Sequence, residues 1–416
     1  MGTLTISCGT YDGSVFALQY DFQTLNIAGP KQLKPVFVDP AAHNSAVTSV
    51  ATKDSLVLSG SSDEIIQIFS LQSKTRLGAL EMHVGTIRQL KFITEPQNST
   101  YCHLFSASDD GCIAIWRCEN PDGKLTKCKT PSSWECIRQI RRHKGPVHSI
   151  AIHPSNRCLF SISEDKTFRV WNLLRGRQAY AIRLKNLADG ARSLSVSPTG
   201  SRLLLVWPDK FDMINLTGEI PADTDCNSSK SEVFSYGSVQ FPNPTTSEPV
   251  FFSEDDDDEV TQNQAALSDP LFAYVLVGVD ASLALFKFSI GGQNSSDRGK
   301  PSLTSKVVLP GKRIKFLQVV NWPSVLVANE TICQGRSRLL VAVTTEADCS
   351  HIRGYIVNLN ETDVLEPGKS FIPLFTYDVW NARITALSAA WSPQNSYVNL
   401  PLSEHSNDAV AENFTF

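Results

Sequence analysis

A strand–turn–strand unit recurs three times in the first half of the chain, beginning at Leu56, Leu104 and Leu159. In each copy a Ser lies four residues before an Asp in the turn, and an aromatic side chain lies six residues after that Asp. The three sets are Ser59, Asp63 and Phe69, then Ser106, Asp110 and Trp116, then Ser161, Asp165 and Trp171. Short apolar runs separated by tight turns are typical of strands. Because the spacing returns without slippage, we expect an all-β array of similar modules.

A His precedes each unit and opens a further alternating strand; these residues are His43, His83 and His143. The combined pattern resembles the WD repeat of β-propellers, with Trp171-Asn172 and Trp116-Arg117 in place of the Trp-Asp pair. A His–Ser–Asp–Trp chain can satisfy the polar groups around such a turn as one hydrogen-bond network. A catalytic triad is the alternative interpretation, but active sites are not normally duplicated at each repeat. We therefore predict structural networks from these twelve residues.

Weaker copies of the strand pair extend the array to seven blades. They lie at 5–20, 203–216, 271–288 and 339–359. The first of these blades lacks an innermost strand, which the segment from Arg383 to Trp391 can supply. The sequence thus predicts one seven-bladed WD-repeat β-propeller over residues 1–392, closed by pairing of the N-terminal and C-terminal strands.

The long connections are predicted to gather on one face of this propeller. With strands a to d numbered from the centre outwards, the a–b and c–d connections share one face, and the d–a and b–c connections share the other. Insertions are expected at 93–101, 118–133, 241–270, 289–303 and 320–337, largely of the first kind. We call the opposite face, formed by the d–a and b–c connections, the tight face. Residues 393–416 have little periodicity, which predicts a flexible C-terminal tail.

The charge distribution points to a candidate partner-binding surface. The formal net charge of −4 excludes a generally basic nucleic-acid binder, but residues 138–192 hold twelve Lys or Arg against three acids. Arg141, Arg142 and Lys144 fall in a d–a connection and Lys166 in a b–c turn, so all four share the tight face. They could hold phosphate oxygens or an acidic peptide, or they could be an ordinary solvated surface. The acidic run 254–259 is interpreted as a solvated loop or a contact for a basic partner.

No motif for catalysis, a cofactor or a metal stands outside the repeat networks, so the sequence predicts a protein that is not an enzyme and takes no small-molecule substrate. The ten cysteines include no Cys-x-x-Cys pair. The longest apolar stretch near the middle, 271–279, is far shorter than the roughly 20 residues that cross a bilayer, and the N-terminus shows no secretory signal. We therefore expect an intracellular protein without a membrane segment.

Part of the chain resembles one family of WD-repeat proteins. The stretches Trp134 to Gly145, Ile152 to Ser155 and Asp165 to Arg177 are similar to the PAK-kinase-interacting WD-repeat family, whose fungal members are named for maintenance of killer virus. Residues 60–69, 78–87 and 381–387 agree with this resemblance.

The resemblance implies a nucleolar scaffold for assembly of the large ribosomal subunit, with pre-ribosomal proteins and ribosomal RNA as partners. In some members it also implies negative regulation of a PAK-type kinase. The alternative hypothesis is a cytoplasmic signalling adaptor that binds kinase regulatory segments.

Overall fold

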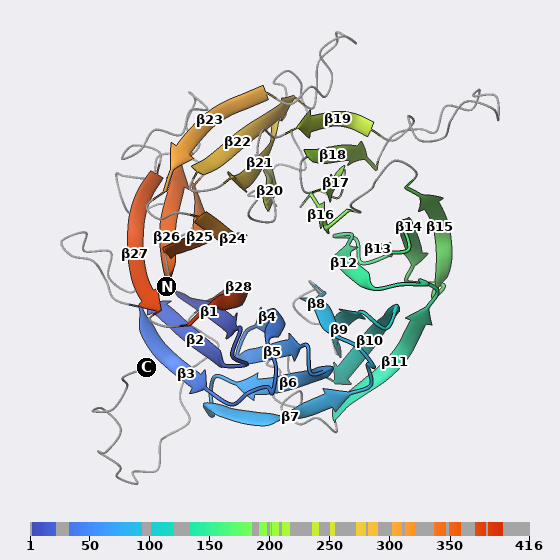
Figure 1. The fold of residues 1–416 in the computed structure, drawn as a ribbon, viewed down its shortest axis with the longest axis horizontal. Coiled ribbons are helices and arrows are strands. Elements are labelled where there is room, and N and C mark those ends of the chain that lie inside the picture. The colour runs from blue at the N-terminus through green and yellow to red at the C-terminus, as the bar shows by residue number, and fades with distance from the viewer. Residues whose placement is uncertain are drawn as a thin grey trace.

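The strands of the computed structural model form seven four-stranded antiparallel sheets arranged around one central axis (Figure 1). The prediction of an all-β propeller is confirmed. The structure describes residues 2–21, 33–93, 101–119, 133–184, 191–197, 200, 202–207, 210–216, 235–240, 250–253, 272–279, 282–289, 302–309, 313–320, 337–346, 349–358, 371–379 and 382–393. Within these ranges no helix has both the length and the hydropathy needed to cross a membrane.

In each sheet the innermost strand lies next to the central axis and the outermost strand lies at the rim (Figure 1). From the inside outwards, the closing sheet holds β28 (Ile384–Pro393), β1 (Gly2–Thr10), β2 (Val15–Asp21) and β3 (Lys34–Asp39). The second sheet holds β4 (Val47–Lys53), β5 (Leu56–Ser61), β6 (Ile65–Ser70) and β7 (Thr75–Glu81). The third holds β8 (Ile87–Phe92), β9 (Tyr101–Ser108), β10 (Cys112–Glu119) and β11 (Trp134–Arg141). The fourth holds β12 (Val147–Ile152), β13 (Cys158–Ser163), β14 (Thr167–Asn172) and β15 (Arg177–Arg183).

The remaining three sheets follow the same order from the axis to the rim. The fifth sheet holds β16 (Ser193–Val196), β17 (Arg202–Val206), β18 (Lys210–Asn215) and β19 (Ser235–Gln240). The sixth holds β20 (Val250–Ser253), β21 (Phe272–Val279), β22 (Ser282–Ser289) and β23 (Ser302–Val308). The seventh holds β24 (Arg313–Val320), β25 (Ser337–Glu346), β26 (Cys349–Asn358) and β27 (Phe371–Val379).

The two ends of the described chain meet in one sheet. β28 pairs antiparallel with β1, and Leu4 lies opposite Trp391 and Cys8 opposite Leu387. β28 is the innermost strand of this sheet, as the sequence predicts for the segment from Arg383 to Trp391. Closing the ring in this way leaves no unpaired sheet at either end of the array.

The hydrophobic core lies between neighbouring sheets. One buried cluster joins Leu58 and Ile66 of the β4–β7 sheet to Leu104 and Trp116 of the β8–β11 sheet. The middle strands are therefore covered on both faces, and β5 is buried at every residue. The rim strand β15 has only one neighbour and is mostly exposed. The continuous apolar runs of the middle strands follow from this two-sided burial.

A second set of polar contacts stitches the innermost strands together. At five junctions in the described part of the ring, a side-chain oxygen of one innermost strand accepts a hydrogen bond from a backbone N–H of the next. The described pairs are Ser388 Oγ with Thr52 N at 3.1 Å, Ser49 Oγ with Leu90 N at 2.9 Å, Gln89 Oε1 with Ile150 N at 2.6 Å, Ser149 Oγ with Leu194 N at 3.1 Å and Gln318 Oε1 with Ala389 N at 2.7 Å. These bonds satisfy amides that an edge strand leaves unpaired.

One predicted insertion contains a strand. β20 lies inside the segment 241–270 and pairs with β21, with Val250 opposite Leu276. The insertion boundary was wrong because a four-residue apolar run is too short to show a strand period. Strands also reach one or two residues into the ends of the other four predicted insertions. The interiors of those four segments, the acidic run 254–259 and residues 394–416 lie outside the described residues.

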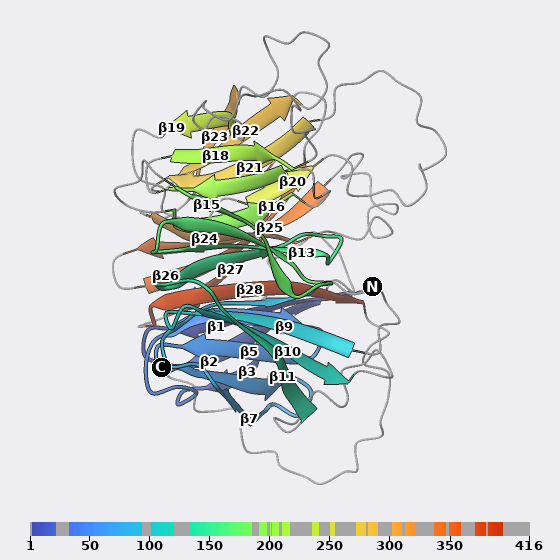
Figure 2. The same ribbon diagram turned by 90° about the vertical axis from the view of Figure 1, so that its right-hand side faces the viewer.

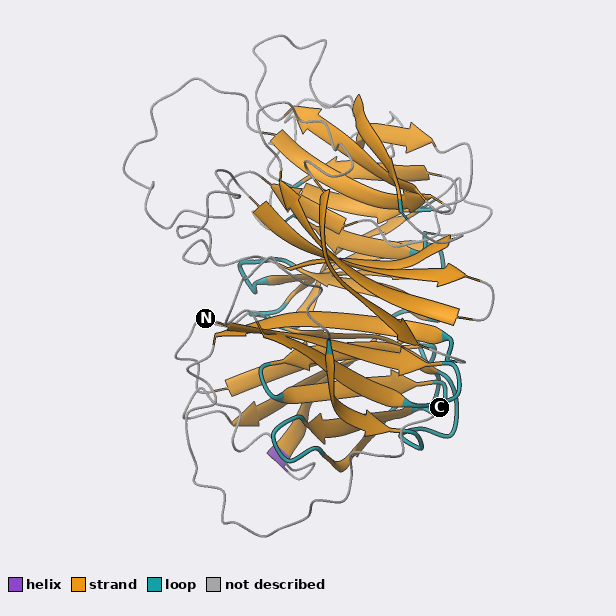
Figure 3. Cartoon of the chain, turned by 90° about the vertical axis from the view of Figure 1, so that its left-hand side faces the viewer, coloured by secondary structure: helices purple, strands orange, loops and turns teal. Residues whose placement is uncertain are grey.

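The edge-on views show strands running from one flat face of the ring to the other (Figure 2, Figure 3). The d–a connections and b–c turns emerge on the tight face. In the b–c turns of the three repeat copies, the residue after the Asp has a positive φ: Glu64 at 72°, Gly111 at 74° and Lys166 at 61°. This left-handed position completes a turn short enough to keep the tight face free of long loops at these blades.

Candidate functional site

The four network residues around Asp165 form one continuous hydrogen-bonded chain. Trp171 Nε1 donates to Ser161 Oγ at 2.8 Å, Ser161 Oγ lies 2.8 Å from His143 Nε2, and His143 Nδ1 lies 3.1 Å from Asp165 Oδ2. The β13 and β14 strands position Ser161 and Trp171, and the turns at the tight face position Asp165 and His143. Ser161 is fully buried and Trp171 is 3% exposed.

The donors and acceptors in this chain assign the histidine tautomer. Since the Ser161 oxygen accepts from the indole, its hydroxyl proton is directed to His143 Nε2, which leaves the His143 proton on Nδ1 facing Asp165. Asp165 also accepts hydrogen bonds from Lys144 N at 2.9 Å and Thr167 N at 2.9 Å. Its carboxylate therefore ties the d–a connection to the b–c turn, which is a structural task.

The two preceding copies show the same geometry. In the β8–β11 sheet, Trp116 Nε1 donates to Ser106 Oγ at 2.9 Å, and His83 lies 2.7 Å from Ser106 and 3.0 Å from Asp110. In the β4–β7 sheet, His43 lies 2.6 Å from Ser59 and 3.0 Å from Asp63. Phe69 replaces the tryptophan there, is fully buried, and packs on Phe37 at a ring distance of 5.1 Å. The structure thus brings together the His, Ser and Asp of all three predicted sets and the tryptophan of two of them.

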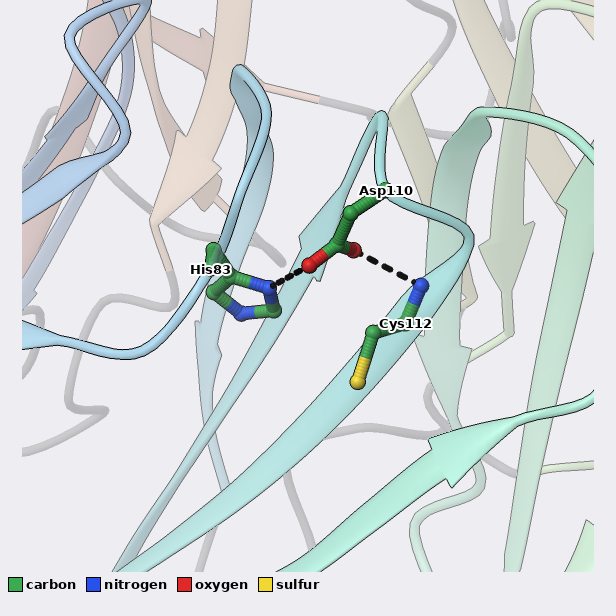
Figure 4. A group of neighbouring side chains, drawn as sticks. All are labelled: His83, Asp110 and Cys112. Carbon is green, nitrogen blue, oxygen red and sulfur yellow. Dashed lines mark hydrogen bonds and ion pairs between the residues drawn. The ribbon is translucent and has the colours of Figure 1, made fainter.

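One network includes a group of potential metal ligands. His83, Asp110 and Cys112 offer ligand atoms within 4.8 Å of one another (Figure 4). However, Asp110 Oδ2 is bonded to His83 Nδ1, and Asp110 Oδ1 accepts from Cys112 N at 2.8 Å. Burial raises the pKa of the Cys112 thiol to about 11, which disfavours the thiolate that binds metals. Ile65 and Thr167 occupy the corresponding position in the other two copies. We therefore interpret the group as part of the network.

Two of the network histidines and two of the network aspartates have lowered pKa values. Burial lowers the pKa of His43 and His143 below the usual histidine value, although Asp63 and Asp165 oppose this effect. Burial alone would raise the pKa of Asp165, but the hydrogen bonds from Thr167 and Lys144 and the proximity of His143 outweigh it and lower that pKa to about 2. The pKa of Asp110 is lowered by bonds of the same kind.

These shifts predict that acid destabilises the propeller. Each histidine with a lowered pKa contributes stability that is complete above pH 6.5 and declines below it. Asp110 and Asp165 contribute stability that is complete above pH 3.8 and is lost as pH falls through their lowered pKa values, which for Asp165 is about 2. We expect the urea midpoint to fall between pH 7 and 5 and again below pH 4. The variant His143→Gln should show a shallower first decline. A urea midpoint independent of pH from 7 to 5 would contradict the prediction.

The four candidate partner-binding residues are exposed, and the structure places two of them around one carboxylate. The backbone N–H of Lys144 binds Asp165, and Lys166 follows Asp165 in the turn. Arg141 ends β11 at the rim, where its Nε donates to Gln139 Oε1 at 3.2 Å, and Arg142 follows it. Among the described residues, none of the four makes an ion pair, although the exposed acid Glu164 lies two positions before Lys166.

Sequence reasoning did not find three features of the structure. The Thr167 hydroxyl donates to Asp165 at 2.5 Å and so belongs to that network. The sequence analysis also did not identify Ser49, Gln89 and Ser149, which accept hydrogen bonds between innermost strands. Each lies six positions after a network His, and this spacing could have indicated them. The third feature is a set of three cationic residues, Arg313, Lys315 and Arg383, at the beginning of β24 and β28. No spacing in the sequence indicates that these residues lie together.

The fold and the repeated networks define a WD-repeat β-propeller. A family model described as WD domain, G-beta repeat matches residues 134–172, which cover β11 to β14 and one complete Ser–Asp–Trp set. The chain is 37% identical over 175 residues to p21-activated protein kinase-interacting protein 1-like of Gallus gallus, a match that covers 42% of both chains.

Two further relatives extend this similarity. The protein of the same name from Danio rerio is 35% identical over 184 residues, covering 44% of both chains. Protein MAK11 of Saccharomyces cerevisiae is 29% identical over 193 residues, covering 43% of both. The chain spans less than half the length of the relatives it matches. Over this part, the resemblance to the PAK-kinase-interacting WD-repeat proteins is confirmed.

Proposed function

We propose that this chain is a non-catalytic WD-repeat scaffold that acts in the nucleolus during assembly of the large ribosomal subunit. Its tight face would dock on ribosomal RNA or on a pre-ribosomal protein through Arg141, Arg142, Lys144 and Lys166. The relatives support the choice of family, and the repeated networks leave their His, Ser and Asp side chains engaged in holding turns together. A scaffold needs an exposed surface that binds its partners and does not need catalytic residues.

The observation that carries the proposal is the exposed pair Lys144 and Lys166 beside Asp165. Asp165 directs its carboxylate oxygens to His143, Thr167 and the backbone N–H of Lys144, so the network consumes its hydrogen-bonding capacity. The ammonium groups of Lys144 and Lys166 make no ion pair with a described acid. Cations presented in this way can contact phosphate oxygens without a desolvated partner to displace.

Reversing these two charges is expected to weaken binding without unfolding the protein. The double variant Lys144→Glu/Lys166→Glu should lose about tenfold or more in co-sedimentation with pre-ribosomal particles, and the salt dependence of binding should become shallower. Thermal melting should change little because both side chains are exposed. The matched control is Arg175→Glu/Arg177→Glu on the opposite face, where Arg175 lies in the connection between β14 and β15 and Arg177 begins β15. Equal binding by both double variants would refute the role of the tight face.

A second candidate function rests on the relatives whose printed names record an interaction with a p21-activated protein kinase. In this alternative the chain is a cytoplasmic adaptor that binds kinase regulatory segments. A pull-down with a PAK-type regulatory domain in the presence of ribonuclease distinguishes the two functions, since it removes RNA-mediated capture. Localisation of the tagged full chain provides the complementary test: nucleolar signal supports the scaffold, and cytoplasmic signal supports the adaptor.

A further inference from the structure

Three cations gather at the tight face where β24 and β28 begin. Arg313 is the first residue of β24, Lys315 is the third, and Arg383 immediately precedes β28. Lys315 Nζ donates to the backbone oxygen of Ile384, which fixes it against the start of β28. We call these residues the cation triad. They lie at the beginning of the neighbouring innermost strands β24 and β28, in a different sector of the ring from the β12–β15 sheet, which holds Lys166 (Figure 1).

The triad has no acidic partner among the described residues. Some arginines elsewhere are paired with acids: Arg88 binds Asp109 at 2.7 Å and Arg76 binds Asp39 at 2.8 Å. In contrast, Lys315 Nζ contacts the backbone oxygen of Ile384 and lies 5.3 Å from the Phe316 ring, and the Arg383 guanidinium lies 5.6 Å from the Tyr11 ring.

The surroundings of Lys315 disfavour its charged form. Burial, together with the nearby charges of Arg383 and Arg313, lowers the pKa of Lys315 to about 8. A partly buried ammonium that is repelled by two guanidinium groups loses hydration and gains unfavourable charge interactions. An anion placed among the three groups would reverse both effects.

We propose that the cation triad binds a phosphate monoester carried by a phosphorylated protein segment. A phosphoserine or phosphothreonine side chain brings nearly two negative charges and three acceptor oxygens to one point. Two guanidinium groups can bind those oxygens in pairs, and the fixed ammonium of Lys315 supplies the third charge. Arg313 and Arg383 are exposed, so such a segment can reach them.

The gathering of the three charges favours a compact dianion over a nucleic-acid backbone. A backbone of singly charged diesters is usually followed by a stripe of cations with aromatic platforms for successive bases. Here the cations lie where two strands begin, and among the described residues Tyr11 is the exposed aromatic ring in contact with them, with 59% of its surface exposed. Tyr11 is held in place because its N–H donates to the Arg383 oxygen at 2.9 Å. It offers a contact for one side chain flanking the phosphorylated residue.

The test compares three labelled probes on the full chain by fluorescence anisotropy at constant ionic strength: degenerate peptides with one central phosphoserine, the same peptides with serine, and a ten-nucleotide uridine RNA. We expect phosphopeptides to bind about tenfold or more tightly than the serine peptides, as one or more charge-assisted hydrogen bonds would give. The variant Arg313→Gln/Arg383→Gln should abolish that preference. The control Arg175→Gln/Arg177→Gln and the variant Lys144→Glu/Lys166→Glu should retain it, so this result is independent of the proposed function.

The urea midpoint of the triad variant separates ligand binding from a structural role. Removing two like charges near Lys315 should leave the midpoint unchanged or raise it, whereas loss of a structural contact would lower it. The proposal is overturned if phosphorylation makes no difference to peptide binding, or if the triad variant retains the preference. It is also overturned if only the RNA probe binds in a triad-dependent way, because the site would then recognise a nucleic acid.

Discussion

Replacing Asp165 with alanine is expected to lower the free energy of unfolding by about 3 kcal/mol. The carboxylate accepts hydrogen bonds from His143, from the backbone of Lys144 and from both the backbone and the hydroxyl of Thr167. Alanine removes all of these acceptors and leaves partly buried donors without partners. Because the bonds join a d–a connection to a b–c turn, the loss should loosen the tight face of this blade as well as the blade itself.

The matched control is the neighbouring acid Glu164, which is exposed in the same turn. Glu164→Ala should stay within about 0.5 kcal/mol of the parent chain. The measurement is the urea midpoint of each variant, with the slope of the transition used to check that the unfolded states are comparable. A similar loss for both variants would mean that the turn, and not the network, responds to substitution. A negligible loss for Asp165→Ala would contradict the structural interpretation of all three copies.

Much of this fold could be predicted because the network spacing fixes the strands around it. The Ser, Asp and Trp of one copy can form a closed network only if two strands pair in one register about one turn, and that register is observed with Ser161 opposite Arg169. The missing innermost strand of the first blade likewise identified the segment that became β28. Such inferences succeed where a spacing of residues is compatible with only one pairing of strands.

Other features depend on how distant strands meet, and the sequence does not report that directly. β20 is only four residues long and owes its place to pairing with β21. The cation triad joins residues about seventy positions apart, because β24 and β28 become neighbours only when the ring closes. The stitching contact of Gln89 with Ile150 also crosses between blades. Repeats therefore reveal the inside of a blade, whereas contacts between blades require the assembled ring.

Trp171 provides a second large effect, and the chain contains its own comparison. Trp171→Ala should lower the free energy of unfolding by about 3–5 kcal/mol, because it empties a buried space lined by Ile150 and Leu159 and removes the donor to Ser161. Trp171→Phe should cost only about 1–2 kcal/mol. Phe69 occupies the corresponding position in the β4–β7 sheet, where it is fully buried and the His43–Ser59–Asp63 chain is still formed.

The order of these two variants distinguishes packing from hydrogen bonding as the main role of the tryptophan. If packing dominates, the phenylalanine variant keeps most of the stability, and its urea midpoint lies much closer to the parent chain than to Trp171→Ala. If the indole N–H dominates, both variants fall by similar amounts, since both lose the bond to Ser161. The ring at position 69 cannot donate a hydrogen bond, yet its network is intact, so the first outcome follows from the structure.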